Sequence, residues 1–469
     1  MKVDNIDITA AIDNARKALV ADPSVSPGLK AMVEMLILVI SLLCKRLQLD
    51  SKNSSIPPSQ DPNREKQSKS ANKRKPGGQK GRKGVTLQKV DNPDEVIEIF
   101  IERRALPKGE YKKVGYDSRQ VFDFEVSVSV TEYQAEILED VNGKRYVATF
   151  PPAVTKAVQY GPGIKANAVY MNCFQMSSLA RIEDHLKDQL NLPVSKGSIF
   201  NFSKDAYDLL EKFEDWTKGA LQNSPVVHAD ETGVNVNGKR HWLHVLCTDK
   251  LSLFHVDEKR GQEAMDRMKV LPEFDNVLCH DHWKPYFRYS CQHSLCNAHH
   301  LRELTFAEEV EKQRWAGELK TLLLDVNQEV QEAGGQLSPQ RQKAVEEKYR
   351  DVLAHGDKES PPPKREKGKR GRPKKTKSRN LLERLRDFEL ETLRFMKEEL
   401  VPFTNNQGEN DLRMTKVQQK VSGCFRAMEG AQIFARVRSY INTCRKNGMR
   451  PTEALILLFE GKTPSFMQV

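Results

Sequence analysis

The sequence predicts a multidomain α/β protein. At 469 residues it is too long for one ordinary domain, and two to four domains are expected. Between residues 223 and 300, short apolar runs of strand length are separated by turn signals. Long stretches with helical periodicity lie on both sides of that region. Elements in this order are typical of a sheet covered by helices, with further helical domains attached.

The composition indicates a folded protein that suits a polyanionic partner. Charged residues make up 30% and hydrophobic residues 38%, which leaves enough apolar side chains for sizeable cores. The net charge of +11 fits nucleic acid, although many basic proteins bind none. The eight cysteines include no Cys-x-x-Cys pair, which favours a reducing compartment over a disulfide framework. Residues 1–21 lack the apolar core of a signal peptide, so a cytoplasmic location is expected.

The first segment, residues 1–50, is expected to form a helical zipper. Its apolar residues step by 4, 3, 4, 3 and 4 positions, which is the a/d spacing of a coiled coil: Leu29, Val33, Leu36, Ile40, Leu43 and Leu47. This seam favours a homodimer or a higher oligomer. The alternatives are packing of the helix on its own core and contact with a membrane. The apolar run at residues 35–43 is too short to span a bilayer, which needs about 20 residues, and no membrane partner is expected.

A basic, glycine-rich arm is predicted at residues 51–92. Residues 51–60 end the helix with Ser, Asn and two prolines. Residues 64–83 are rich in Lys, Arg and Gly, and such a run cannot bury a core. Its glycines let backbone amides approach an anion, which predicts phosphate contacts beside Lys80 and Arg82. A solvated linker is the alternative interpretation.

Residues 93–155 and 156–222 are predicted to form two small domains. In the first, β-rich module, apolar residues alternate at 96–101 and at 126–130, and Asn142-Gly143 is a hairpin signal. The second is helical. Its helix at 178–190, the break that follows and the cap at Ser195 have helix-turn-helix spacing. This pair of helices is expected either to read DNA or to pack against the next domain.

A central domain begins at residues 223–300. Strands are expected at 225–230, on both sides of the turn Asn237-Gly238, at 251–256, at 276–280 and at 293–296, with a helix at 261–271. Asp230 ends the first strand, and Asp281 follows the strand after the helix. A meander, a helix and then a strand with a second acid follow the ribonuclease H-like order.

The element that would complete such a core is delayed. The next candidate acid, Glu409, lies 128 positions after Asp281 (409 − 281), whereas the first two acids are 51 positions apart (281 − 230). The intervening residues 301–400 are mostly helical and contain a basic loop at 364–379. The sequence therefore predicts a ribonuclease H-like catalytic core that is interrupted by a helical insertion. Residues 401–448 would complete the core, and 449–469 would form a tail.

Asp230, Asp281 and Glu409 are candidate ligands of two Mg²⁺ ions. Phosphoryl transfer needs charge neutralisation and an aligned nucleophile, and two ions about 3.5–4 Å apart supply both. Magnesium prefers hard carboxylate oxygens. We expect Asp230 to bridge the ions and the other two acids to hold one each, and we expect Mn²⁺ to substitute. With 64 Asp and Glu, a single acid says little, and Glu231 is expected on the opposite face of its strand.

Cations follow the third acid. On a helix, Glu409, Arg413, Lys416 and Lys420 share one face, because they are spaced by 4, 3 and 4 residues. A turn and a further cation, Arg426, follow. This pattern predicts a metal ligand beside a phosphate clamp. Salt-bridge pairing on a solvated helix would give the same pattern.

The insertion carries a second DNA-binding signal. Residues 369–375 contain the Arg-Gly-Arg-Pro core of an AT-hook, with Arg370 and Arg372 expected in an A·T minor groove. A flexible basic loop is the alternative. The metal alternatives are weak, since Cys291, Cys296 and His299 have loose ligand spacing. His280 and His282 flank Asp281, and we expect them to position the site or the DNA, because imidazole is a poor Mg²⁺ ligand.

Four motifs resemble the large transposase of bacterial insertion sequences of family 66. They are HADET at 228–232, HDHWKPY at 280–286, CNAHHLREL at 296–304 and the long block NNQGENDLRMTKVQQKVSGCFR at 405–426. The segments SKNSSIPPSQD at 51–61 and RKPGGQKGRKG at 74–84 look like the leading segments of that family. The resemblance implies a DDE transposase, nucleoid-associated in bacteria, that acts on terminal inverted repeats and target DNA, with small accessory proteins as possible partners. Its acids carry over as Asp230, Asp281 and Glu409, and its Glu-x₆-Lys pattern falls on Glu409 and Lys416.

The chain departs from this family at one place. Members commonly carry a cysteine zinc module after the glycine-rich arm, but residues 106–116 contain no Cys, so no zinc is expected there. The β-rich module would instead be held by aromatic packing from Tyr111, Tyr116, Phe122 and Phe124. Two rival functions stay open: a non-catalytic, transposase-derived DNA-binding protein and a ribonuclease H-like nuclease that cuts without strand transfer.

Overall fold

The structure is a computed structural model that describes residues 2–3, 6–22, 25–47, 53, 87–124, 126–363 and 373–467. Four predicted DNA-binding residues, Lys80, Arg82, Arg370 and Arg372, lie outside the described residues. The same holds for most of the basic arm and for residues 364–372 of the basic loop. In its described part the chain forms fifteen α-helices and a mixed five-stranded sheet, so the predicted α/β class is confirmed.

The N-terminal segment is a pair of helices after a short two-stranded ladder. The elements are β1 (Lys2–Val3), β2 (Ile6–Asp7), α1 (Ile8–Ala21) and α2 (Pro27–Leu47). On α2, Ile37 is buried at 5% exposure, whereas Leu36 is 60% exposed and Leu43 is 55% exposed. The predicted helix is present, and most of the apolar seam faces solvent in the single chain. None of the described helices is long and apolar enough to cross a membrane.

Most of the strands predicted for the β-rich module do not form in the described residues. Within described residues 87–124 and 126–150, the strands are the hairpin β3 (Ile137–Glu139) and β4 (Arg145–Val147), and a separate 3₁₀ turn, η1 (Arg103–Ala105), precedes them in the chain. The hairpin turns at Gly143 (φ +80°), as Asn142-Gly143 predicted. The expected strand at 96–101 does not form, and Ile99 is 86% exposed. A strand needs a partner for its backbone groups, and no neighbouring segment supplies one here.

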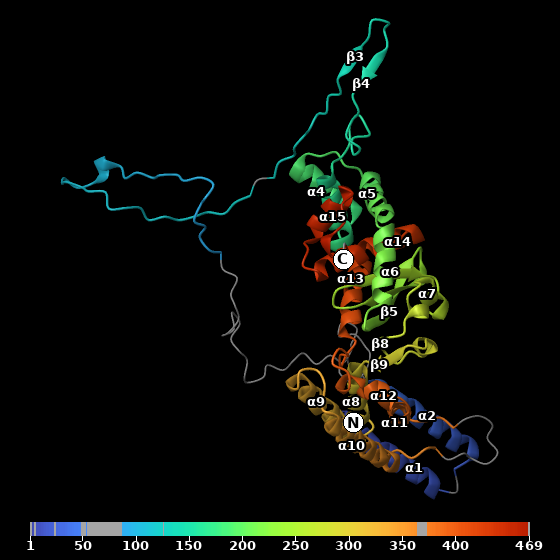
Figure 1. Ribbon diagram of the computed structural model, residues 1–469. Coiled ribbons are helices and arrows are strands. Elements are labelled where there is room, and N and C mark those ends of the chain that lie inside the picture. The colour runs from blue at the N-terminus through green and yellow to red at the C-terminus, as the bar shows by residue number, and fades with distance from the viewer. Residues whose placement is uncertain are drawn as a thin grey trace.

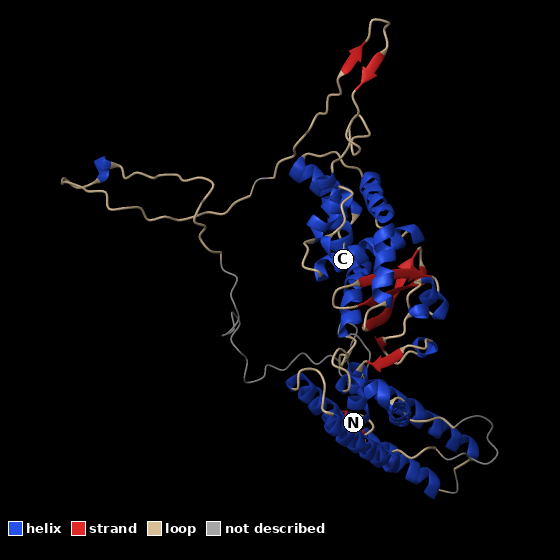
Figure 2. Cartoon of the chain, in the orientation of Figure 1, coloured by secondary structure: helices blue, strands red, loops and turns tan. Residues whose placement is uncertain are grey.

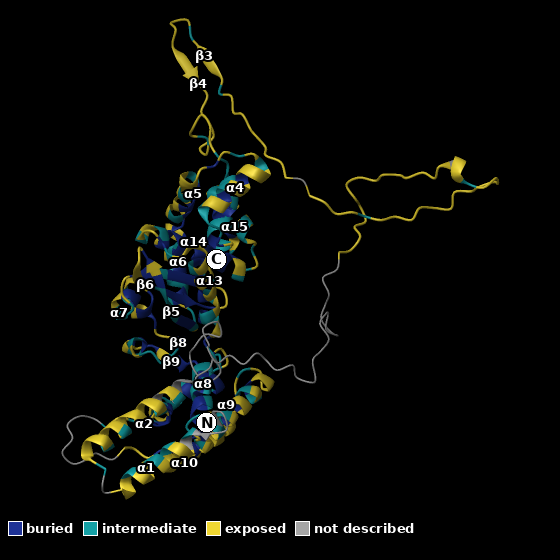
Figure 3. Cartoon of the chain, turned by 180° about the vertical axis from the view of Figure 1, so that it is seen from behind, coloured by how far each residue is buried: buried dark blue, intermediate teal, exposed yellow. Residues whose placement is uncertain are grey.

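The expected aromatic packing of this module is also absent. The side chains named for it are exposed by 60%, 55%, 48% and 83%: Tyr111, Tyr116, Phe122 and Phe124. Figure 3 shows this part of the chain as an exposed excursion from the helical body. Alternating apolar residues therefore indicated a strand where the folded chain buries no apolar face.

A helical body precedes the sheet. It contains α3 (Pro162–Val169), the π-helix η2 (Tyr170–Phe174), α4 (Leu179–Leu190), α5 (Lys196–Leu209) and α6 (Glu211–Gln222). The predicted cap at Ser195 is present, because its side chain accepts a hydrogen bond from Ser198 N, and Ser178 caps the preceding helix by accepting one from Arg181 N. The C-terminal helices α14 (Met428–Lys446) and α15 (Pro451–Phe459) share one core with α3 to α5.

The sheet, whose strands are red in Figure 2, has the strand order β7-β6-β5-β8-β9. The antiparallel meander is β5 (Val226–Val236), β6 (Lys239–Cys247) and β7 (Ser252–Asp257). The parallel strands β8 (Val277–His280) and β9 (Gln292–Leu295) lie on the other side of β5. Short helices join them: α7 (Gln262–Arg267), η3 (Leu271–Glu273) and η4 (Lys284–Arg288). The strands predicted at 225–230 and before Asn237 are one continuous strand.

Helices cover both faces of the sheet. One face packs on the end of α6, on α7 and on η3, through residues such as Leu221, Met265 and Leu271. The other face packs on α13 (Asn406–Ser422) and α14, through residues such as Leu412 and Phe434. Successive residues of a strand point to opposite faces, so each position of β5 faces one of these two helical layers.

Residues 297–396 form a helical block after β9, drawn below the sheet in Figure 1. Its elements are α8 (Asn297–Glu309), α9 (Arg314–Glu332), α10 (Pro339–Glu359), α11 (Lys377–Asp387), α12 (Glu389–Leu393) and η5 (Arg394–Met396). Trp315 and Tyr349 lie in its apolar core. The helix predicted from 300 to 333 breaks near Lys312, whose φ is +56°. The chain ends with η6 (Ser465–Met467).

Candidate active site

Asp230 and Asp281 lie at matching positions of two neighbouring parallel strands. The ladder between β5 and β8 pairs Val226 with Val277 and His228 with Cys279. Continued by two residues, the same pairing places Asp230 opposite Asp281, the residue that directly follows β8. Partners in a parallel ladder point to the same face, and neighbouring strands are about 4.8 Å apart. The two carboxylates therefore emerge side by side on the face that α13 covers.

Asn405 fixes the start of α13 against β5. Its side-chain amide donates to Ala229 O at 2.8 Å, and its Oδ1 lies 2.8 Å from Nδ1 of the buried His228. Its backbone N–H donates to Cys296 Sγ at 3.1 Å. Because Asn405 immediately precedes the helix, these bonds set where the first turn of α13 begins relative to Asp230.

Gly408 allows the first turn of α13 to approach Asp230 closely. A Cβ atom built at Gly408 would lie 3.3 Å from Asp230 Cβ and 3.3 Å from Asn405 Nδ2. Contacts of that length are tighter than ordinary van der Waals contact, so a larger residue would press on Asp230. Glu409 is the next residue on the helix, and its charge acts on the pKa of Asp230.

The far end of α13 is also held to β5. After the helix, Phe425 N donates to Asn235 O at 2.9 Å, and Asn237 N donates to Phe425 O at 2.8 Å. Val236 and Phe425 form a parallel bridge there. Helix α13 thus lies along β5 and is fixed at both ends, which limits the freedom of Glu409 between them.

Asp230 lies in an environment that disfavours its charged form, and the other two acids contribute to this. Burial raises the pKa of Asp230 to about 8, and the neighbouring charge of Glu231 adds to the rise. Asp281 and Glu409 raise the pKa of Asp230 further, whereas the Glu231 backbone N–H lowers it. Glu409 Oε1 is buried without a hydrogen-bond partner, and none of the three acids forms an ion pair within the described chain. A cluster of this kind lacks a compensating cation.

Glu231 belongs to the opposite face of the sheet, as its place in the strand predicted. Its carboxylate accepts hydrogen bonds from Arg260 Nη2 and from the Tyr286 hydroxyl, each at 2.6 Å. The Arg260 guanidinium lies over the rings of Trp242 and Trp283, at 4.7 and 4.3 Å from their centroids. Trp283 N in turn donates to Asp281 Oδ1 at 2.9 Å. Glu231 therefore supports the site through packing, and its two carboxylate oxygens already have partners.

The histidines beside Asp281 lie in an aromatic cluster. His280 Nε2 is 3.0 Å from His293 Nδ1, and the ring of His282 packs edge-on against Phe388 at 4.4 Å. Burial lowers the pKa of His280 to about 3 and that of His282 to about 4. Both are thus neutral near pH 7, and this cluster joins the end of β8 to the helical block.

The predicted cations of α13 lie on its outer side. Arg413, Lys416 and Lys420 are exposed, while Leu412 and Thr415 are buried against the sheet. Lys416 Nζ donates to Gly233 O at 3.2 Å. Burial and the charge of Arg240 lower the pKa of Lys416, whereas the charge of Asp230 raises it. In the described chain, no ion pairs are formed by the four predicted cations of this region, which are Arg413, Lys416, Lys420 and Arg426. Paired salt bridges therefore do not explain the pattern.

A group of possible metal ligands adjoins the third acid. Ligand atoms of Cys296, His299 and Glu409 all lie within 4.8 Å of one another. From the sequence, Cys291 was the third member of a possible ligand group with Cys296 and His299. In the described structure the third member of that group is Glu409. The Cys-x-x-His spacing at the start of α8 was the available signal. Its link to an acid more than a hundred residues later was invisible without the fold.

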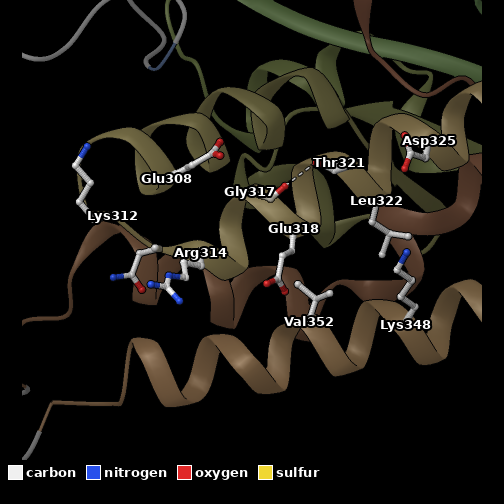
Figure 4. Close-up of a pocket in the computed structure, with 11 residues that line it drawn as sticks. Glu308, Lys312, Arg314, Gly317, Glu318, Thr321, Leu322, Asp325, Lys348 and Val352 are labelled. Atoms are coloured by element: carbon white, nitrogen blue, oxygen red, sulfur yellow. Dashed lines mark hydrogen bonds between the residues drawn. The ribbon is translucent and has the colours of Figure 1, made fainter.

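The described chain also contains an open groove. A groove of about 900 Å³ runs between α9 and α10 and is lined by charges of both signs, including Glu318, Asp325 and Lys348 (Figure 4). It lies within the helical block, away from the three acids. Because it lacks a buried polar cluster, it does not compete with the acid site as a candidate for chemistry.

Two residues essential to the geometry were not singled out from the sequence. Asn405 and Gly408 lie in the block NNQGEN, which pointed to Glu409 alone. Neither residue type carries chemistry, and their roles follow only from the backbone contacts described above. The site is built from β5, β8 and α13, three elements that are distant in the sequence.

A comparison with protein families identifies the family of the chain. The chain belongs to the transposase IS66 family, whose model matches residues 157–433, more than half of the chain. Residues 3–88 match a family of unknown function, DUF6444. No curated protein matches the chain. The match to IS66 covers β5, β8, the helical block and α13, and it confirms the family resemblance drawn from the motifs.

Proposed function

We propose that this transposase cuts DNA at the terminal inverted repeats of an insertion sequence and joins it to target DNA, with Asp230, Asp281 and Glu409 as its catalytic acids. The observation that carries this proposal is that Asp230 and Asp281 lie at matching positions of β5 and β8, while the first turn of α13, which bears Glu409, packs closely against Asp230. Such acids are expected where divalent cations assist phosphoryl transfer.

The proposed core is ribonuclease H-like. An antiparallel meander of three strands, with two parallel strands beside the first, supports this assignment. The acids at the ends of β5 and β8, with a third on α13, fit the same plan. The helical block of residues 297–396 would then be an insertion between the fifth strand and the final helix of the core.

The site fits the hard cations that this function needs. The partnerless Glu409 Oε1 and the raised pKa of Asp230 both indicate negative charge that lacks compensation. Asp230, Asp281 and Glu409 would hold two Mg²⁺ ions, and Mn²⁺ is expected to substitute. When bound, such ions neutralise the phosphate and lower the pKa of a coordinated water.

The chain itself would position the DNA. Lys416 is held by Gly233 beside Asp230, where its charge can meet a phosphate next to the scissile one. Arg413, Lys420 and Arg426 are exposed nearby without ion-pair partners in the described chain, so they are free to hold the DNA backbone. Lys80, Arg82, Arg370 and Arg372 are proposed as further phosphate and minor-groove contacts on grounds of sequence alone.

A strand-transfer assay tests the proposal. The full-length protein is mixed with linear DNA that carries the ends of the element, with a target plasmid and with Mg²⁺. Wild type should give strand-transfer product, and Asp230→Asn should give none while it binds the DNA ends as before. Asp249→Asn is the matched control, because Asp249 is an exposed residue of the turn between β6 and β7.

The other outcomes separate the rival functions. DNA binding without cleavage by wild type would favour a non-catalytic DNA-binding protein. Cleavage without joining would favour a nuclease. Equal joining by wild type and Asp230→Asn would show that the assigned site is wrong.

A further inference from the structure

We propose that Cys296, His299 and Glu409 form a binding site for one zinc-class divalent cation, distinct from the magnesium pair. Their ligand atoms lie within 4.8 Å of one another, a separation that one cation can bridge. Thiolate, imidazole and carboxylate together are a donor set that zinc accepts and that magnesium avoids.

The fold holds the three side chains together from two directions. Cys296 is the residue that precedes α8, and His299 lies in the first turn of that helix, so the Cys-x-x-His spacing places both on one side of its start. Glu409 comes from the first turn of α13. The helices are joined here, because Asn297 N donates to Phe403 O at 3.1 Å and Asn405 N donates to Cys296 Sγ at 3.1 Å.

Two of the three residues have unused buried ligand atoms. Within the described chain, His299 Nδ1 and Glu409 Oε1 are buried and have no hydrogen-bond partner. Buried polar atoms without partners are rare in folded proteins, because each loses its hydrogen bonds to water and gains none in return. Both occur in one cluster beside Cys296, which is 1% exposed. A bound cation would satisfy them, and the N–H of Asn405 would support the coordinated sulfur from outside.

The proposed site has three protein ligands, which leaves a fourth position for water or another oxygen. It shares Glu409 with the magnesium site proposed above, but Asp230 and Asp281 are not part of it. Cation binding at these three residues can be measured without DNA. The inference therefore stands or falls independently of strand transfer.

Cobalt(II) serves as the probe, because it replaces zinc and its coordination by thiolate gives a charge-transfer absorption. The full-length protein, freed of metal by a chelator, is titrated with Co²⁺ and then with Zn²⁺ as competitor. Wild type should bind one cobalt per chain with the thiolate band, and zinc should displace it. Cys296→Ser should remove the band and weaken binding at least about 100-fold, more than the loss of an outer contact costs.

Matched variants test whether these three side chains, and not neighbouring ones, hold the cobalt. Cys291→Ser removes a thiol that is also buried but lies outside the cluster, and it should keep the band. His299→Ala and Glu409→Gln should weaken the cobalt binding that the thiolate band reports, and Asp281→Asn should leave that band unchanged. Any one of three results would overturn the proposal. Wild type would show no thiolate band, the band would persist in Cys296→Ser, or Asp281→Asn would lose the band as fully as the cluster variants do. Asp230→Asn should lose strand transfer and keep the band, which distinguishes failure of one proposal from failure of the other.

Discussion

At the scale of single residues, the acids alone do not make this site. Their motifs were visible in the sequence, and the family resemblance assigned them the same role. What the sequence did not show is how Asn405 and Gly408 bring Glu409 to Asp230. The Asn405 side chain bonds to residues of β5, and Gly408 lets the helix approach Asp230 closely; both effects depend on a helix placed there by the fold. Their contribution can be tested one residue at a time.

Asn405→Ala should impair both stability and activity. The change removes the hydrogen bonds to Ala229 O and to His228 and leaves both groups buried without a partner. We expect a loss of about 2–3 kcal/mol in the free energy of unfolding and at least a tenfold loss of DNA cleavage. Denaturant unfolding and a cleavage assay measure the two effects. Asn406→Ala, at the exposed neighbour, is the control, and equal behaviour of the two variants would contradict this role.

Gly408→Ala should reduce cleavage with little loss of fold. The added methyl would lie 3.3 Å from Asp230 Cβ, so α13 or the aspartate must shift by a few tenths of an ångström. Small displacements of catalytic groups cost rate strongly, and we expect a loss of about tenfold or more in single-turnover cleavage. Gly430→Ala on α14 is the control, since a Cβ there meets nothing within 4 Å. Full activity of Gly408→Ala would show that the close approach is unimportant.

At the scale of elements, the central sheet was predicted closely and the N-terminal strands were not. The runs at 225–230, 251–256 and 276–280 became strands, because each can be paired and covered on both faces. The run at 96–101 has the same pattern, but no neighbour covers it. The periodicity of the sequence indicates which side chains could be buried, and packing in the fold decides which of them are buried. The position of α13 over the sheet likewise depends on contacts that the sequence pattern does not contain.

One such contact is the ion pair between α13 and α14. Asp411 Oδ2 accepts from Lys446 Nζ at 2.7 Å and from Ser252 Oγ at 2.7 Å, and both charged side chains are nearly buried. Lys446→Met should leave the Asp411 charge without its ion-pair partner, so we expect about 3 kcal/mol of destabilisation. Lys462→Met, which breaks an exposed pair with Glu460, should cost less than about 1 kcal/mol. Similar urea midpoints for the two variants would argue against a structural role for this pair.

At the scale of the whole molecule, the proposed cutting of DNA at two element ends calls for more than one copy of the site. The α2 seam offers a way to join two chains, since Leu29, Leu36 and Leu43 are each more than half exposed in the single chain. Apolar residues at a/d spacing are buried when two such helices pair. The described structure holds one chain, so this assembly remains a prediction from the sequence and the exposure of the helix.

Leu36→Glu should therefore weaken self-association. We expect wild type to run as a dimer or larger in light scattering after gel filtration, and we expect the variant to shift toward the monomer mass. Val20→Glu on α1 is the control, because Val20 is 83% exposed and lies outside the seam. Monomeric wild type at micromolar concentration, or an unchanged mass of Leu36→Glu, would contradict pairing through α2.

The most direct test of the proposed function locates the cations themselves. Crystals of the full-length protein bound to an element end are grown with Mn²⁺, and anomalous scattering then shows where manganese lies. Two peaks among the carboxylates of Asp230, Asp281 and Glu409, with their loss in Asp230→Asn, are the predicted result. Manganese bound elsewhere, or three carboxylates that hold no cation in the presence of DNA, would contradict the assignment of these acids as the catalytic site.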